Sequence, residues 1–187
     1  MIWLSSSTIA RLRDQLRTRG QRPSVSLGVA LGAAPGVAAG GGLGDAAELA
    51  MASVEYGPIC EAMYLMMSAD GKITAVERDV LKGALRNLSG DSVRSVHIDA
   101  MLDVALKNVE EQGREARLHD VIEKLRDDPA RAEVAFVLAA AIAFADNAIA
   151  DEENETLSLF AEGLGIDEAR AEELLDSVEG DLAQRSV

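Results

Sequence analysis

The body of this chain contains two copies of one sequence unit, and this duplication limits the folds that it can adopt. The segments MSADGKITAVERDVLKGALRNL and AFADNAIADEENETLSLFAEGL align with each other without a gap. The alignment pairs Asp70 with Asp146 and Glu77 with Glu153. Each copy predicts a helix that ends at an Ala-Asp pair, a short loop, and a second helix with the glutamate in its first turn. We therefore expect a duplicated helix-loop-helix fold.

Composition and periodicity both favour an all-α domain. Only one Trp, two Tyr and three Phe occur, and the apolar content is mostly Ala, Leu, Val, Ile and Met. One buried helical face is marked by the spacing of Ile98, Met101, Leu102, Ala105, Leu106 and Val109. No segment alternates with period two for long enough to predict a strand. Helices are expected near residues 46–56, 58–69, 74–88, 93–111, 116–126, 129–145, 151–164 and 167–178.

Several helix starts are marked by capping residues. Asp45 with Glu48, and Thr74 with Glu77, have the form of capping boxes, in which each side chain bonds the backbone N–H of the other residue. Asp128 precedes a proline, as an N-cap before a first-turn proline does. These patterns predict where three of the helices begin.

Charge and hydropathy divide the chain into three regions. These are a basic amphipathic helix in residues 1–24, a glycine-rich apolar segment in residues 25–45, and an acidic all-helical domain in residues 46–187. Residues 1–45 hold five arginines and two aspartates, a net charge of +3, so the total of −14 leaves −17 on the domain. Such a domain repels nucleic acid and favours cations or basic partners.

The N-terminal region has the pattern of a helix that lies on a membrane surface. Ile9, Leu12 and Leu16 recur at helical spacing among five arginines, and Trp3 lies near the start. A basic amphipathic helix of this kind binds anionic lipid, and its arginines predict a cytoplasmic N-terminus. The alternative is a solvated arginine-rich face.

The apolar segment carries glycine at every fourth position. Close helix–helix contact in lipid uses small residues at this spacing, so the stripe predicts a membrane anchor that forms homo-oligomers. A flexible linker and a packed soluble segment are the alternatives, since Pro35 interrupts the segment and few residues are strongly apolar. The stripe consists of Gly28, Gly32, Gly36, Gly40 and Gly44.

The paired carboxylates are candidate metal ligands. Neither loop has the ligand pattern of an EF-hand, because apolar residues occupy most of the early ligand positions. A twofold arrangement could instead bring Asp70, Glu77, Asp146 and Glu153 together as an oxygen-only site for Ca²⁺, Mg²⁺ or Mn²⁺. The alternative is structural, with each glutamate capping its helix and each aspartate bonding its own loop.

The segments SADGKITAVERDVL and FADNAIADEENETL resemble the tellurite-resistance TerB family, its membrane-protein relatives and the N-terminal domain of the DjlA co-chaperone. The resemblance covers roughly residues 50–178. It implies a compact helical fold in the bacterial cytoplasm, attached to the inner membrane, and a role in metal-ion or envelope stress. The chain lacks the His-Pro-Asp tripeptide of a J domain, so co-chaperone activity is not implied.

No pattern in the chain supports catalysis. His97 and His119 stand on different predicted helices without a second His or Cys at ligand spacing, and Glu123 beside His119 is interpreted as a solvated neighbour. Cys60 lies in an apolar context and is expected to be buried. Two functions stay open: a non-enzymatic, membrane-attached interaction module of the TerB type, or a soluble cation-binding or scaffold protein with an N-terminal partner-binding tail.

Overall fold

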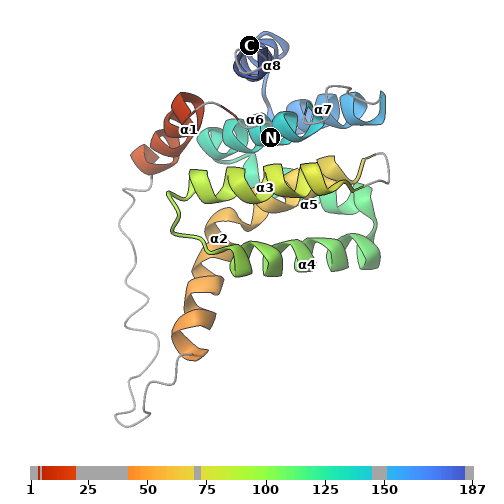
Figure 1. Ribbon diagram of the computed structural model, residues 1–187. Helices are drawn as coiled ribbons and strands as arrows, with labels where there is room; N and C mark the ends of the chain where they lie inside the picture. The colour runs from red at the N-terminus through yellow and green to blue at the C-terminus, as the bar shows by residue number, and fades with distance from the viewer. Residues whose placement is uncertain (1–3, 5, 20–41, 70–72, 145–150, 184–187) are drawn as a thin grey trace.

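The computed structural model describes residues 4, 6–19, 42–69, 73–144 and 151–183 (Figure 1). The described residues form eight helices and contain no strand, which confirms the all-α prediction. The helices are α1 (Ser6–Arg19), α2 (Gly42–Met67), α3 (Ala75–Leu88), α4 (Ser95–Gln112), α5 (Arg114–Leu125), α6 (Pro129–Ala143), α7 (Asp151–Leu164) and α8 (Glu168–Ala183).

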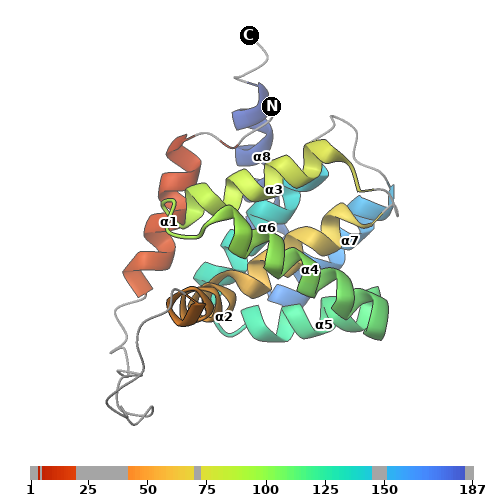
Figure 2. The same ribbon diagram turned by 60° about the horizontal axis from the view of Figure 1, so that its bottom comes forward.

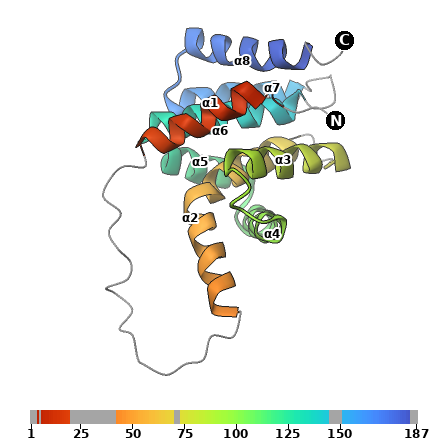
Figure 3. The same cartoon turned by 60° about the vertical axis from the view of Figure 1, so that its left-hand side comes forward.

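The duplication is confirmed by where the helices begin and end. Helices α2 and α6 end at residues that the alignment of the two copies pairs, and α3 and α7 both begin and end at paired residues. The central helices α2 and α6 pack against each other, α3 crosses to contact α6, and α7 crosses to contact α2. Helix α4 covers α2, and α8 covers α6. Figure 3 shows α4 and α8 at opposite ends of the stack of helices.

Helix α1 completes the internal symmetry. It packs on α6 and α3, as α5 packs on α2 and α7. The domain therefore consists of two four-helix units, α1–α4 and α5–α8, and the second view shows α1 and α5 on opposite sides of the central pair (Figure 2). Ile9 and Leu12 of α1 are buried in the core, with Leu16 packed against it. The apolar face predicted to lie on lipid is thus covered by protein.

The two central helices supply most of the core. Every residue from Ile59 to Met67 and from Val134 to Ala143 is buried. Cys60 lies among them, and burial, with the nearby Glu61 carboxylate, raises the pKa of its thiol to about 12. The thiol is therefore protonated and unreactive at neutral pH. The predicted core leucines are all buried: Leu81, Leu85, Leu88, Leu157 and Leu164.

The prediction of separate helices at 46–56 and 58–69 was wrong, because α2 continues through Pro58. A proline inside a helix has no N–H to donate to the carbonyl four residues earlier, here that of Val54. Arg131 of α6 replaces this donor: its Nη2 lies 3.4 Å from the Val54 carbonyl oxygen and also donates to the Glu55 carbonyl. The helix bends along its length and its first half projects beyond the other helices (Figures 1 and 3).

Two of the three predicted helix starts are confirmed. Thr74 and Glu77 form a capping box at α3, and the Asp128 side chain accepts bonds from the first backbone N–H groups of α6. The capping box predicted at Asp45 and Glu48 was wrong. Helix α2 already begins at Gly42, so both side chains stand within it and bond elsewhere.

If α1 is part of the folded domain, truncating one of its buried side chains destabilises the whole protein. We expect Leu12→Ala to lower the free energy of unfolding by about 2–5 kcal/mol, because Leu12 is fully buried. Leu159→Ala is the matched control, since Leu159 is 51% exposed, and it should change stability by less than about 1 kcal/mol. Urea unfolding followed by circular dichroism measures both. Equal effects would show that α1 is not packed on the domain.

Candidate functional site

The structure describes the side chain of one of the four predicted carboxylate ligands. Asp70 and Asp146 lie outside the described residues, as does the side chain of Glu153. Glu77 is buried, and its Oε2 accepts bonds from the Thr74 N–H at 2.7 Å and the Thr74 hydroxyl at 2.6 Å. Glu77 therefore caps its helix. Whether the four carboxylates share a cation stays a prediction.

Arg114 connects the helices that flank the two duplicated loops. Its Nη2 donates to the hydroxyl of Thr156 in α7 at 2.7 Å, and its Nε and Nη2 donate to the carbonyl of Leu65 near the end of α2 at 3.3 Å. A cavity of about 210 Å³ beside it is lined by Ala69 and Glu155, among others. The end of α2 and the first turns of α7 therefore lie on the same side of the domain.

A hollow among the described residues lies between α2 and α4. It has a volume of about 520 Å³, and residues of α5 and α6 complete its lining. Its apolar side chains include Leu49 and Val54 from α2, and Met101 and Val104 from α4. Gly57 and Ala100 leave the space between the two walls open. We call this hollow the α2–α4 groove.

A buried ion pair forms the floor of the α2–α4 groove. Glu61 and Arg117 bond through two parallel contacts, Nε to Oε1 at 2.7 Å and Nη2 to Oε2 at 2.9 Å. Asp120 and Gln112 accept from Nη1 of the same guanidinium. The Glu61 hydrogen bonds raise the pKa of Arg117, so this arginine stays charged. The pair links α2 to α5 and leaves no net charge of its own in the groove.

Two further cations border the groove. Lys124 has no carboxylate partner within the described parts of the chain, and the guanidinium of Arg131 contacts only backbone carbonyls there. Residues 46–187 carry a net charge of −17, so these two cations stand in an otherwise acidic part of the chain. The groove therefore combines an apolar surface with two cations at its border.

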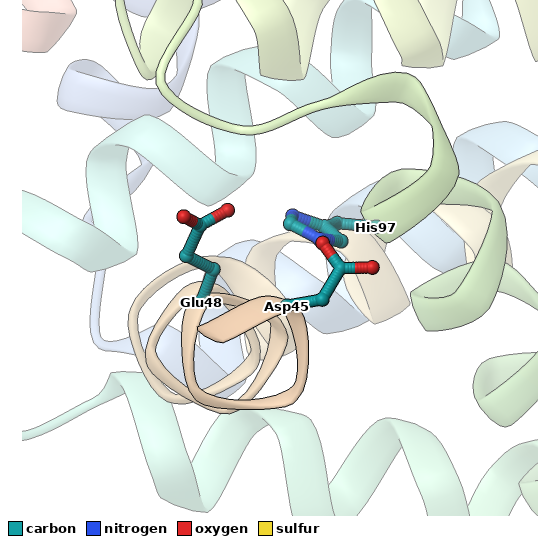
Figure 4. Close-up of side chains that lie close together, drawn as sticks. All are labelled: Asp45, Glu48 and His97. Atoms are coloured by element: carbon teal, nitrogen blue, oxygen red, sulfur yellow. The ribbon is translucent and has the colours of Figure 1, made fainter. Parts of the chain in front are cut away.

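A second cluster joins the projecting half of α2 to the start of α4. Figure 4 shows Asp45 and Glu48 facing the ring of His97, and their ligand atoms all lie within 4.8 Å of one another. Arg94 lies between them. Its Nη2 contacts Asp45 Oδ1, Glu48 Oε2 at 3.3 Å and His97 Nε2 at 2.8 Å.

Sequence patterns could not identify the buried ion pair or the cluster around His97. Glu61 and Arg117 are 56 residues apart, so neither forms a local motif. No pattern indicates that His97 meets Asp45, because they belong to helices that only the fold brings together. His119 fits its prediction: it is exposed, and its Nδ1 lies 3.9 Å from Glu123 Oε1.

The predicted membrane segment is largely outside the described residues. Residues 20–41 contain most of the glycine stripe, and of its five glycines only Gly44 is described. Gly44 is exposed and has open space where a side chain would lie. Among the helices of the described residues, none is long and apolar enough to cross a bilayer.

Comparison with known proteins identifies a family. A family model described as "Tellurite resistance protein TerB" matches residues 59–176. The match extends from the bend of α2 into α8, so it includes the Glu61–Arg117 pair but not α1, Asp45 or Glu48. No curated protein and no solved structure matches the chain.

Removing one member of the Glu61–Arg117 pair should lower the free energy of unfolding more than replacing both members. Arg117→Ala leaves the buried Glu61 carboxylate without its guanidinium, and Glu61→Ala leaves Arg117 with only the partly exposed Asp120 as a carboxylate partner. We expect each change to lower the free energy of unfolding by about 3–5 kcal/mol. Glu61→Leu with Arg117→Met replaces both by apolar groups of similar size and should cost much less than the two single changes together. Urea denaturation measures all three variants. Single variants within about 1 kcal/mol of the parent would show that water reaches the pair.

Proposed function

The chain belongs to the TerB family, and on this premise we propose that it is a non-enzymatic interaction module. Its α2–α4 groove binds an amphipathic helix of a partner protein, with the apolar face of that helix in the groove and its acidic residues beside Lys124 and Arg131. The observation that carries this proposal is the apolar groove with two cations at its border.

The shape of the groove favours a helix as the bound element. Two helices form its walls, and a third helix can place its apolar side chains between them. Val54 and Val104, one on each wall, are 78% and 59% exposed. Met51 on the projecting half of α2 is 73% exposed, so apolar surface continues beyond the groove. This extent suits a macromolecule better than a small ligand.

Charge favours an acidic partner at the groove. Residues 46–187 carry a net charge of −17, so most of their surface repels an acidic helix. Lys124 and Arg131 attract carboxylates at the border of the groove, where apolar contacts are also available. Attraction and repulsion together fix the orientation of the bound helix.

A designed peptide tests the groove. The probe is a fluorescent amphipathic helix with leucines at i, i+3, i+4 and i+7 and glutamates at one end. We expect Val104→Ser with Lys124→Glu to weaken its binding about tenfold in fluorescence anisotropy, which corresponds to about 1.4 kcal/mol.

The matched control is Val96→Ser with Lys107→Glu. Val96 is also on α4 and is 58% exposed, but neither control residue lines the groove. The control should bind like the parent chain. Equal loss in both variants, or tighter binding of a peptide with lysines in place of the glutamates, would contradict the proposal.

We also propose attachment to the bacterial inner membrane through residues 1–45. Because the apolar face of α1 is covered by α3 and α6, the attachment would rest on the apolar segment and on the arginines of α1. The basic charge of this region supports contact with anionic lipid. An attached module of this kind would serve in the response to metal-ion or envelope stress that the family resemblance implies.

A second candidate function is binding of a divalent cation by Asp70, Glu77, Asp146 and Glu153. It is supported by Arg114, which links the helices flanking both loops. The bonds of Glu77 to Thr74 use Oε2, so among the described residues Oε1 is the oxygen that would bind a cation. The side chains of Asp70, Asp146 and Glu153 lie outside the described residues, so this candidate rests on the duplicated sequence.

Thermal unfolding separates a cation site from capping alone. A specific site stabilises the fold by RT ln(1 + [L]/Kd), about 2.7 kcal/mol at a hundredfold excess over Kd. We expect Ca²⁺ or Mn²⁺ to raise the melting temperature at about 0.15 M monovalent salt, where diffuse binding is screened. Asp70→Asn with Asp146→Asn should abolish the rise. If the carboxylates only cap helices, the rise is absent, and Glu77→Ala costs about 0.5–2 kcal/mol with or without metal.

A further inference from the structure

We propose that Asp45, Glu48 and His97 form a binding site for a divalent transition metal ion of the zinc class. The ion takes the position that the guanidinium of Arg94 now holds between the three side chains. Asp45 and Glu48 precede the residues that match the TerB family model. Two of the three ligands therefore lie outside the matched region, and the site is separate from the four carboxylates of the duplicated loops.

His97 provides the main reason for a metal at this position. It is only 3% exposed, and its Nε2 lies 2.8 Å from Arg94 Nη2. A guanidinium has donors only, so Nε2 must be the acceptor, and its lone pair points into the cluster. A metal ion bonds to this same lone pair. The buried ring thus already has the tautomer and the direction that metal binding requires.

The two carboxylates complete a ligand set. Asp45 Oδ1 lies 3.6 Å from His97 Nε2, and the ligand atoms of all three residues lie within 4.8 Å of one another. Asp45 and Glu48 stand three residues apart on α2, so one helix face presents both to the ring. Small side-chain rotations can bring these atoms to the roughly 2.0–2.2 Å that zinc needs.

Arg94 is a cation that a metal can replace. It is the residue before α4, its side chain makes no cap bond to that helix, and half of the side chain is exposed. Its guanidinium can therefore turn into water without leaving a buried charge behind. When a metal ion replaces the guanidinium, the two carboxylates face a charge of +2 instead of +1.

The donor atoms select the class of metal. One imidazole nitrogen with two carboxylate oxygens suits Zn²⁺, Co²⁺ or Ni²⁺, whereas Ca²⁺ and Mg²⁺ prefer oxygen ligands alone. Three protein ligands leave a fourth position of a tetrahedral zinc ion for water.

Zinc titration of the full chain tests the site. The probe is ZnCl₂ in isothermal titration calorimetry, at about 0.15 M NaCl with excess MgCl₂ to suppress diffuse binding. We expect one zinc equivalent whose affinity falls at least about tenfold in Asp45→Asn with Glu48→Gln, a loss typical of damaged metal sites. Both side chains are half-exposed or more, so this variant should fold normally.

Two further variants make the result specific. Arg94→Gln removes the competing guanidinium and should tighten zinc binding, whereas a purely structural ion-pair cluster predicts no gain. His119→Gln with Glu123→Gln is the matched control, because it removes an exposed His–carboxylate pair elsewhere and should leave zinc affinity unchanged.

Nitrogen NMR of the imidazole gives an independent readout. Zinc should shift the Nε2 resonance of His97 and leave its Nδ1 protonated. The proposal is overturned if zinc binds the Asp45→Asn, Glu48→Gln variant as tightly as the parent chain, if Arg94→Gln does not tighten binding, or if the His97 resonances do not move.

Discussion

The bent helix α2 is held in place by arginines from the second four-helix unit, and the surfaces of the domain depend on this arrangement. Pro58 leaves the Val54 carbonyl without its helical donor, and Arg131 supplies one. Arg117 neutralises Glu61 one turn further on, and Arg114 bonds the carbonyl of Leu65. These contacts fix how the first half of α2 leaves the core, and so fix the wall of the α2–α4 groove.

Local patterns in the sequence predicted the elements whose causes are local. The capping box at Thr74, the N-cap at Asp128 and the repeat spacing of α3 and α7 all follow from residues close in the chain. The course of α2 could not be predicted from nearby residues, since a proline normally predicts that a helix breaks. It continues because Arg131, 77 residues away from Val54, bonds the carbonyls near the bend.

The candidate sites were harder to predict for the same reason. The sequence identified Glu77 and its repeat partners because they recur, but the groove needs four helices and the His97 cluster needs two. Asp45 and Glu48 match a capping box in sequence, yet the helix starts earlier and turns both side chains toward Arg94. A pattern of a few residues cannot show which distant cation its carboxylates will meet.

The buried pair also bears on the history of the duplication. Glu61 belongs to the first unit and Arg117 to the second, and when the alignment of the two copies is extended, the counterpart of Glu61 is Val137. A symmetric dimer of two second units would place Arg117 against this valine, so the guanidinium would lose both hydrogen bonds to Glu61 and keep those to Asp120 and Gln112. The second unit therefore depends on the first for the carboxylate that pairs with its buried arginine.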